Sequence, residues 1–182
     1  MSSKILLWKN GKSSIWVLKI YPYYQKFAKD FEKKKQEIVV IAQDIEVHHI
    51  GSTAVRGLGG KGIIDIMIGV KNWQGVEKLI AGLQKIGFEH VHPKEKGKIF
   101  LSSIKESGLG DFHIHLVIIG SAAYKNFLAF RDYLQGRPKE AENYFKLKLF
   151  CYKEAKGERA IYTKMKTSYI KEILEKIRYA KN

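Results

Sequence analysis

The 182-residue sequence has little cysteine, no long apolar run and a shortage of acidic residues. Its single cysteine, Cys151, excludes an internal disulfide and is typical of a protein kept in a reducing compartment. No stretch approaches the ~18 apolar residues of a membrane helix, and the N-terminal segment has neither the apolar core nor the cleavage site of a signal peptide. We therefore expect a cytoplasmic protein with no membrane partner.

The shortage of acids leaves a large positive charge, because 33 Lys and Arg face 18 Asp and Glu, a formal net charge of +15. An excess of this size favours anionic partners such as nucleotides, phosphorylated metabolites or nucleic acid. Lysines far outnumber arginines, however, and a solvated lysine-rich surface accounts for the same composition. Nucleic-acid binding rests on this charge alone, and it predicts basic side chains spread over an outer face.

Hydrophobic periodicity predicts alternating strands and helices followed by a purely helical segment. Strands are expected at residues 5–9, 14–20, 45–50, 62–70, 87–92, 97–104 and 111–119. Helices are expected from Pro22 to about residue 42, at 73–86 and 122–134, from Pro138 to about 156, and at 158–179. The Asn10-Gly11 dipeptide favours a tight turn between the first two strands. This order predicts a single α+β domain over 1–182: an N-terminal hairpin (1–20), an α/β core with a mixed sheet (21–120) and a helical cap (121–182).

The stretch HIGSTAVRGLGGKGIIDI combines a glycine-rich loop with an apolar strand. Gly51 permits close approach of the backbone, and Ser52 or Thr53 offers hydroxyl and N–H groups to a phosphate. Lys61 would neutralise the charge of such a group. The spacing G-x-x-x-x-G-K-[ST] is missing, which excludes a P-loop. The loop is therefore a candidate phosphate site of another kind.

Strand alternation places Asp65 on one face of its strand and both His113 and His115 on one face of theirs. If the two strands are neighbours, these side chains line one cleft, and His49 could join them. Asp65 suits a divalent cation such as Mg²⁺, and two histidines at i, i+2 can share a transition metal with His49 or Asp65 as a third ligand. His113 or His115 also suits a general base. The alternative is a set of histidines that only form hydrogen bonds.

A second group of candidate ligand-binding residues lies in the helical cap. One stripe of the last helix carries Arg159, Tyr162, Thr163 and Lys166. Arg131 and Lys148, from the two preceding helices, could converge with it over the cleft and bind a phosphate or an adenine-like ring. The alternative is structural: Arg131 paired with an acid such as Asp132 or Glu172, and the tyrosines in the core.

The order HIGSTAV-GL--K-IIDI, an H-x-H strand, FRDYL, Y--LK and YT--K resembles the GrpB family from about Trp16 to Leu174. That resemblance implies a nucleotidyltransferase-like fold, related to polymerase-β-type enzymes. The family also occurs fused to dephospho-coenzyme A kinase. Enzymes of this fold use a Gly-Ser at a helix start and three acids that hold two metal ions.

In these terms Gly51 and Ser52 match the Gly-Ser, and Asp65 matches the first acid. Met67 occupies the position of the second acid, and the H-x-H strand occupies the position of the third. Methionine is a poor ligand for magnesium. The resemblance thus implies binding of a nucleotide or another phosphorylated small molecule, with metal-dependent nucleotidyl transfer. The alternative is a non-catalytic accessory domain with a degenerate active site that binds a nucleotide or a partner protein.

The sequence departs from the usual GrpB pattern at two positions of the loop. Arg56 and Gly62 each stand where a proline is common, and both changes remove local rigidity. Arg56 adds a positive charge to a loop that would face a phosphate. We therefore expect a different loop conformation, with stronger anion binding, on an unchanged fold.

Overall fold

A computed structural model describes the backbone of residues 4–9, 12–17, 19–95, 97–103, 109–156 and 158–179. Its main sheet has five strands in the order β3-β4-β7-β6-β5. The strands are β3 (Ile45–Ile50), β4 (Ile64–Val70), β5 (His90–Glu95), β6 (Lys98–Ser102) and β7 (Phe112–Ile118). The central pair β4 and β7 is parallel and the other pairs are antiparallel. The predicted mixed sheet is confirmed.

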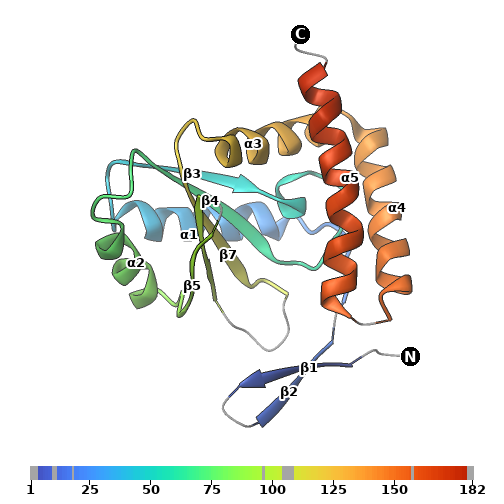
Figure 1. Ribbon diagram of the computed structural model, residues 1–182, viewed down its shortest axis with the longest axis horizontal. Helices are drawn as coiled ribbons and strands as arrows, with labels where there is room; N and C mark the ends of the chain where they lie inside the picture. Colours follow the sequence, from blue (N-terminus) through green and yellow to red (C-terminus); the bar gives the residue numbers. More distant parts are fainter. Residues whose placement is uncertain are drawn as a thin grey trace.

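Helices lie on both faces of this sheet, as Figure 1 shows. One face is covered by α1 (Lys26–Val39) and α2 (Val76–Lys85), and the other by α3 (Ala122–Gln135). The last two helices, α4 (Pro138–Glu154) and α5 (Arg159–Tyr179), pack on each other and on α3 beside the sheet. The predicted C-terminal helical cap is therefore present. None of the described helices combines the length and the apolar character needed to cross a bilayer.

The two faces of β4 are filled by different side chains. Ile64, Ile66 and Ile68 are fully buried in the main core beneath α1 and α2. Met67 points the other way and packs with Ile50 and Val117 against α3. Because side chains alternate along a strand, the face that carries Met67 also carries Asp65, and Asp65 lines a pocket on this face.

An N-terminal hairpin forms a separate two-stranded sheet of β1 (Lys4–Lys9) and β2 (Lys12–Val17). Lys9 pairs with Lys12, which agrees with the predicted hairpin, although the second strand begins two residues earlier than predicted. The Asn10-Gly11 turn itself lies outside the described residues.

Two of the predicted boundaries that are wrong have a clear local cause. The first helix begins at Lys26 rather than Pro22, because Tyr21 forms an antiparallel bridge with Gly60 and keeps this part of the chain extended. The strand expected from residue 87 begins at His90. Gly87 has a φ of 98°, and the N–H of Phe88 donates to the carbonyl of Leu83 to close α2.

Candidate functional site

The glycine loop returns the chain so that its start lies over the start of β4. Ile50, the last residue of β3, pairs with Asp65 in the antiparallel register. Gly51 follows with a φ of 71° and leads into a short 3₁₀ turn, η1 (Ser52–Ala54). The Gly51 backbone therefore lies directly against the Asp65 carboxylate, a close approach that a residue without a side chain allows.

Asp65 and the two histidines of β7 lie together, as strand alternation predicts. Asp65 pairs with His113 in the parallel register, and Met67 pairs with His115. Oδ1 of Asp65 is 3.4 Å from Nδ1 of His113 and 3.6 Å from Nε2 of His115. Burial disfavours the charged carboxylate, but hydrogen bonding and charge interactions with both imidazoles outweigh it and hold the pKa of Asp65 well below its usual range.

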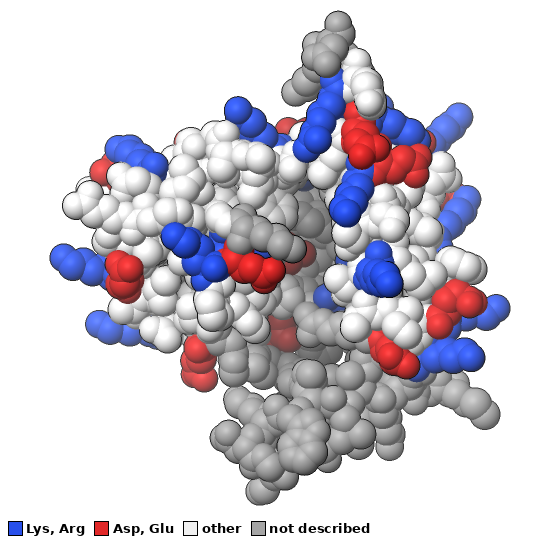
Figure 2. Space-filling view, viewed as in Figure 1, with Lys and Arg blue, Asp and Glu red and all other residues white. Residues whose placement is uncertain are grey.

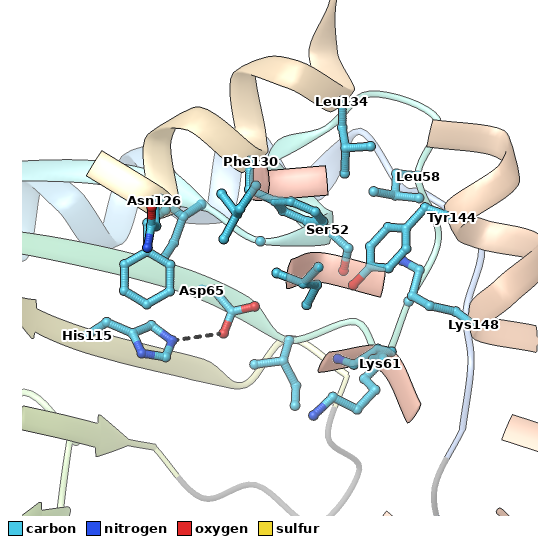
Figure 3. Close-up of a pocket in the computed structure, with 18 of the residues that line it drawn as sticks. Ser52, Leu58, Lys61, Asp65, His115, Asn126, Phe130, Leu134, Tyr144 and Lys148 are labelled. Carbon is cyan, nitrogen blue, oxygen red and sulfur yellow. Dashed lines mark ion pairs between the residues drawn. The ribbon is translucent and has the colours of Figure 1, made fainter. Parts of the chain in front are cut away.

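A pocket of about 540 Å³ lies between this carboxylate, the glycine loop and the helices α3, α4 and α5. Figure 2 shows the hollow between the sheet and the α4–α5 pair, and Figure 3 shows Asp65, Ser52, Tyr144 and Lys148 around it. The predicted site residues that line it are Gly51, Ser52, Lys61, Asp65, His115, Lys148, Tyr162 and Lys166. The structure thus brings together residues from five separate elements and loops.

The pocket is electrostatically positive. Among the described residues that line it, the cations are Lys61, Lys98, Lys148 and Lys166, and the anion is Asp65. Burial raises the pKa of both Tyr144 and Tyr162. Both phenols therefore keep their protons and can donate hydrogen bonds to an oxyanion. On the face seen in Figure 2 the other basic side chains are spread out rather than gathered in one patch.

His49 does not join this group, contrary to the prediction. It pairs with Ile66 and therefore faces α1, where its ring stacks on Phe31 at 4.5 Å between centroids. Nε2 of His49 is 3.0 Å from Oγ1 of Thr53, which itself donates to the carbonyl of Ile63 at 3.2 Å. Burial, reinforced by the charge of Arg131, lowers the pKa of His49 to about 4 even though Asp65 opposes the shift. His49 is a neutral support of the loop.

Three further predicted residues stand outside the pocket lining. Thr53 is only 2% exposed and is held by the bonds just described. Arg131 donates to the adjacent Asp132 at 2.7 Å and to the carbonyl of His49 at 3.1 Å. Its role is therefore the structural one, a pairing with a neighbouring acid, that was the alternative to ligand binding. His113 contacts Asp65 but does not line the pocket. The side chain of Arg159 lies outside the described residues.

The described side chains do not fit a two-metal centre. Met67, at the position of the second acid, is fully buried under α3 with Ile50 and Val117. Both imidazoles approach the same oxygen of Asp65, which leaves each of them paired with the acid. In the part of the chain that the structure describes, no three His, Cys, Asp or Glu side chains are grouped to hold a metal ion.

The two departures from the GrpB pattern have different consequences: Arg56 lies away from the main pocket, and Gly62 changes the path of the loop backbone. Arg56 is exposed and lines a second hollow with Gln135 and Glu142. It does not line the main pocket, contrary to the prediction. Gly62 has a φ of 73°. Proline cannot adopt this angle, so the chain here follows a path that the usual proline would forbid.

Several lining residues were missed from the sequence. They are Lys98, Asn126, Phe127, Phe130 and Tyr144. Tyr144 had a usable signal, since it lies four residues before Lys148 on one helical face. The other residues lie on β6 and α3, and only tertiary packing reveals that they reach the pocket.

Comparison with known proteins identifies the family of this chain. The GrpB protein family profile matches residues 17–176. The chain belongs to the GrpB family. It is 30% identical over 152 residues to the glutamate-rich protein GrpB of Alkalihalophilus pseudofirmus, covering 81% of this chain and 87% of that protein.

Solved structures extend the comparison to the fold. The GrpB crystal structure from Enterococcus faecalis is 27% identical, with a TM-score of 0.76, covering 87% of this chain and 96% of that one. The complex of Cid1 with its short product ApU is 15% identical, with a TM-score of 0.50, covering 70% of this chain and 41% of that one. This GrpB chain therefore has a nucleotidyltransferase-like fold, as the resemblance implies.

Proposed function

We propose that the pocket binds a nucleotide or another phosphorylated small molecule. The observation that carries this proposal is its charge: Lys61, Lys98, Lys148 and Lys166 face a cavity whose anionic side chain, among the described residues, is Asp65. Ammonium groups in a partly enclosed site form strong hydrogen bonds with phosphate oxygens. Ser52, at the turn after Gly51, adds a hydroxyl to the same wall.

The remaining wall supports a ligand that also carries an aromatic ring. The cavity is also lined by the apolar side chains Leu58, Phe127, Phe130, Leu134 and Ile170, and Figure 3 shows Leu58, Phe130 and Leu134 on the side above Asp65. Stacking and apolar contact with such side chains suit the flat face of a nucleobase. The cavity volume of about 540 Å³ falls within the range of roughly 300–1,000 Å³ typical of small-molecule sites.

Lysines rather than metal ions would neutralise the phosphate in this arrangement. The two-metal mechanism needs several carboxylates around the reacting phosphate, and here Met67 is buried at the second position. We therefore favour a binding domain over a nucleotidyltransferase. A single divalent cation held by Asp65 and the ligand, with His115 as base, stays a prediction of the family resemblance.

Calorimetric titration with ATP and with AMP tests the proposal, first in EDTA and then with Mg²⁺ or Mn²⁺. We expect binding in EDTA that survives Asp65→Asn, because removal of the anion leaves the lysines in place. Binding that requires the cation and is lost in Asp65→Asn would favour the transferase instead. If neither nucleotide binds at millimolar concentration under any condition, the proposed function is wrong, and the partner-protein alternative gains support. A steep salt dependence with oligonucleotides but not ATP would favour nucleic acid.

A further inference from the structure

Lys148 is the most deeply buried charged group of the pocket. It projects from α4, is 2% exposed, and lines the cavity beside Tyr144 (Figure 3). Its Nζ donates a hydrogen bond to the carbonyl of Gly59 in the glycine loop. The same nitrogen lies 4.9 Å from the ring centre of Tyr144 and 5.7 Å from that of Phe145.

Among the described residues, these contacts leave the lysine without a negative partner. Buried ammonium groups are normally paired with carboxylates, yet within the described ranges no Asp or Glu side chain forms an ion pair with Lys148. One carbonyl and two ring faces compensate for only part of the lost hydration. A buried amine that faces a cavity and has no counter-ion is a position that an anionic ligand can complete.

The surroundings of Lys148 contain both signs of charge. The charged and titratable groups that line the same cavity are Lys166 and Tyr162 from α5, Tyr144 from α4, Lys61 from the loop, Asp65 from β4, Lys98 from β6 and His115 from β7. Burial and then the charge of Lys166 lower the pKa of Lys148 to about 7, while Asp65 opposes the shift. The carboxylate acts from beyond ion-pair distance, so the ammonium form of Lys148 has no ion-pair partner among the described residues.

We propose that Lys148 selects anionic ligands, with the ligand's phosphate serving as the counter-ion that the described residues do not provide. This inference rests on the proposed function and assigns one residue to recognition of the phosphate. It also couples two events, because a ligand that supplies negative charge favours the protonated amine. The Gly59 carbonyl holds Nζ at the pocket wall, so the ammonium forms where the phosphate binds.

The coupling has a definite sign. A bound phosphate raises the pKa of Lys148 from its value of about 7, so between the free and bound values each binding event takes up a proton. Affinity then falls as pH rises above 7, by up to about tenfold per pH unit. The second ionisation of a terminal phosphate, near pH ~6, is complete in this range and does not offset the effect.

Calorimetry with ATP in EDTA at pH 8 measures this proton uptake directly. Titrations in two buffers that differ in ionisation enthalpy and contain no phosphate, for example HEPES and Tris, should give different apparent enthalpies, equivalent to uptake of up to one proton per ATP. Lys148→Met should weaken binding at least tenfold and abolish the buffer dependence. Lys153→Met, an exposed change on the same helix, should leave both quantities unchanged.

A second variant covers the case in which Lys148→Met does not fold. Because the charge of Lys166 lowers the pKa of Lys148, Lys166→Met should move the onset of proton uptake to higher pH while uptake itself remains. ATP binding by the wild type without net proton uptake at pH 8 would overturn the inference and leave the proposed function intact. Equal uptake in folded Lys148→Met would do the same. Failure of the wild type to bind ATP would instead count against the proposed function.

Discussion

Gly51 leaves the space that the Asp65 carboxylate occupies. A methyl group on Gly51 would overlap Oδ2 of Asp65 and come within 3.0 Å of its Cβ. The glycine also has a φ of 71°, which is unfavourable for any other residue. The Gly-Ser of the family pattern is thus tied to the acid fourteen residues later by steric fit, which explains why this loop and this strand form one unit.

Gly51→Ala should therefore destabilise the protein by about 3 kcal/mol or more, from backbone strain plus overlap. Gly57→Ala is the matched control, because Gly57 has a similar φ of 82° but a Cβ added there would meet open space. It should cost only about 1 kcal/mol. Urea denaturation of both variants measures the difference. Equal losses of stability in the two variants would mean that overlap with Asp65 adds nothing to the cost of a side chain at position 51.

Asp65 should contribute to stability in a pH-dependent way. Its pKa is held below the usual range by His113 and His115, so its contribution is present above the unfolded pKa of ~3.9 and is lost as pH falls toward the folded value. We expect Asp65→Asn to cost about 1–3 kcal/mol at neutral pH and progressively less below pH ~4.

The control for this prediction is Asp44→Asn. Asp44 pairs with Lys71 at 3.5 Å, but its side chain is 87% exposed, and exposed pairs contribute little. Denaturation at a series of pH values separates the two positions. A constant difference between wild type and Asp65→Asn across the acid range would contradict the assigned ion pairs.

His49 should make the protein less stable as pH falls from 7 to 5. Its folded pKa is about 4, below the unfolded value of ~6.5, so the unfolded chain takes up the proton first, at a cost of about 2 kcal/mol over this interval. His49→Phe, which keeps the stack on Phe31, should flatten the stability–pH curve by this amount. His92→Phe on the exposed β5 should retain the slope. Chemical denaturation at both pH values decides the matter.

Arg131 and Lys61 should separate stability from ligand binding. Arg131 ties α3 to the carbonyl of His49 and does not line the pocket. Arg131→Met should therefore lower stability by about 1–2 kcal/mol and leave the ATP affinity within about twofold of wild type. Lys61→Met should lower that affinity about tenfold, the loss of one charge-assisted contact. Calorimetry and thermal unfolding of both variants provide the two readouts. A large loss of ATP affinity in Arg131→Met would show that Arg131 takes part in ligand binding.

Alternation within single strands could be read from the sequence, and it explains the successes. Asp65 and the β7 histidines were placed together because each strand is an apolar run whose polar residues share one face. The prediction for His49 was wrong because the face on which it lies depends on the register between β3 and β4, which the intervening loop sets. Arg131 was ambiguous because a local acid, Asp132, competed with the cleft.

The rest of the pocket depends on packing between distant elements. Lys98 on β6 and Phe127 on α3 reach it only because β6 lies beside β7 and α3 crosses the same face. Lys148 was named as a phosphate ligand, but its burial and its bond to Gly59 follow from how α4 sits against the loop. No periodicity within one helix contains that information.

Met67 gives the most direct test of whether a metal centre of the nucleotidyltransferase type can be built on this fold. It is fully buried with Ile50 and Val117 beneath α3, so Met67→Asp would place a carboxylate in an apolar layer. We expect a loss of about 4 kcal/mol or more in stability and no Mn²⁺-dependent ATP binding. Met67→Leu, of similar volume, should cost less than about 1.5 kcal/mol. Thermal unfolding and calorimetry with Mn²⁺ measure both effects. Wild-type stability together with new Mn²⁺-dependent ATP binding in Met67→Asp would show that a side chain at the second acid position can reach the pocket. That result would support the transferase hypothesis.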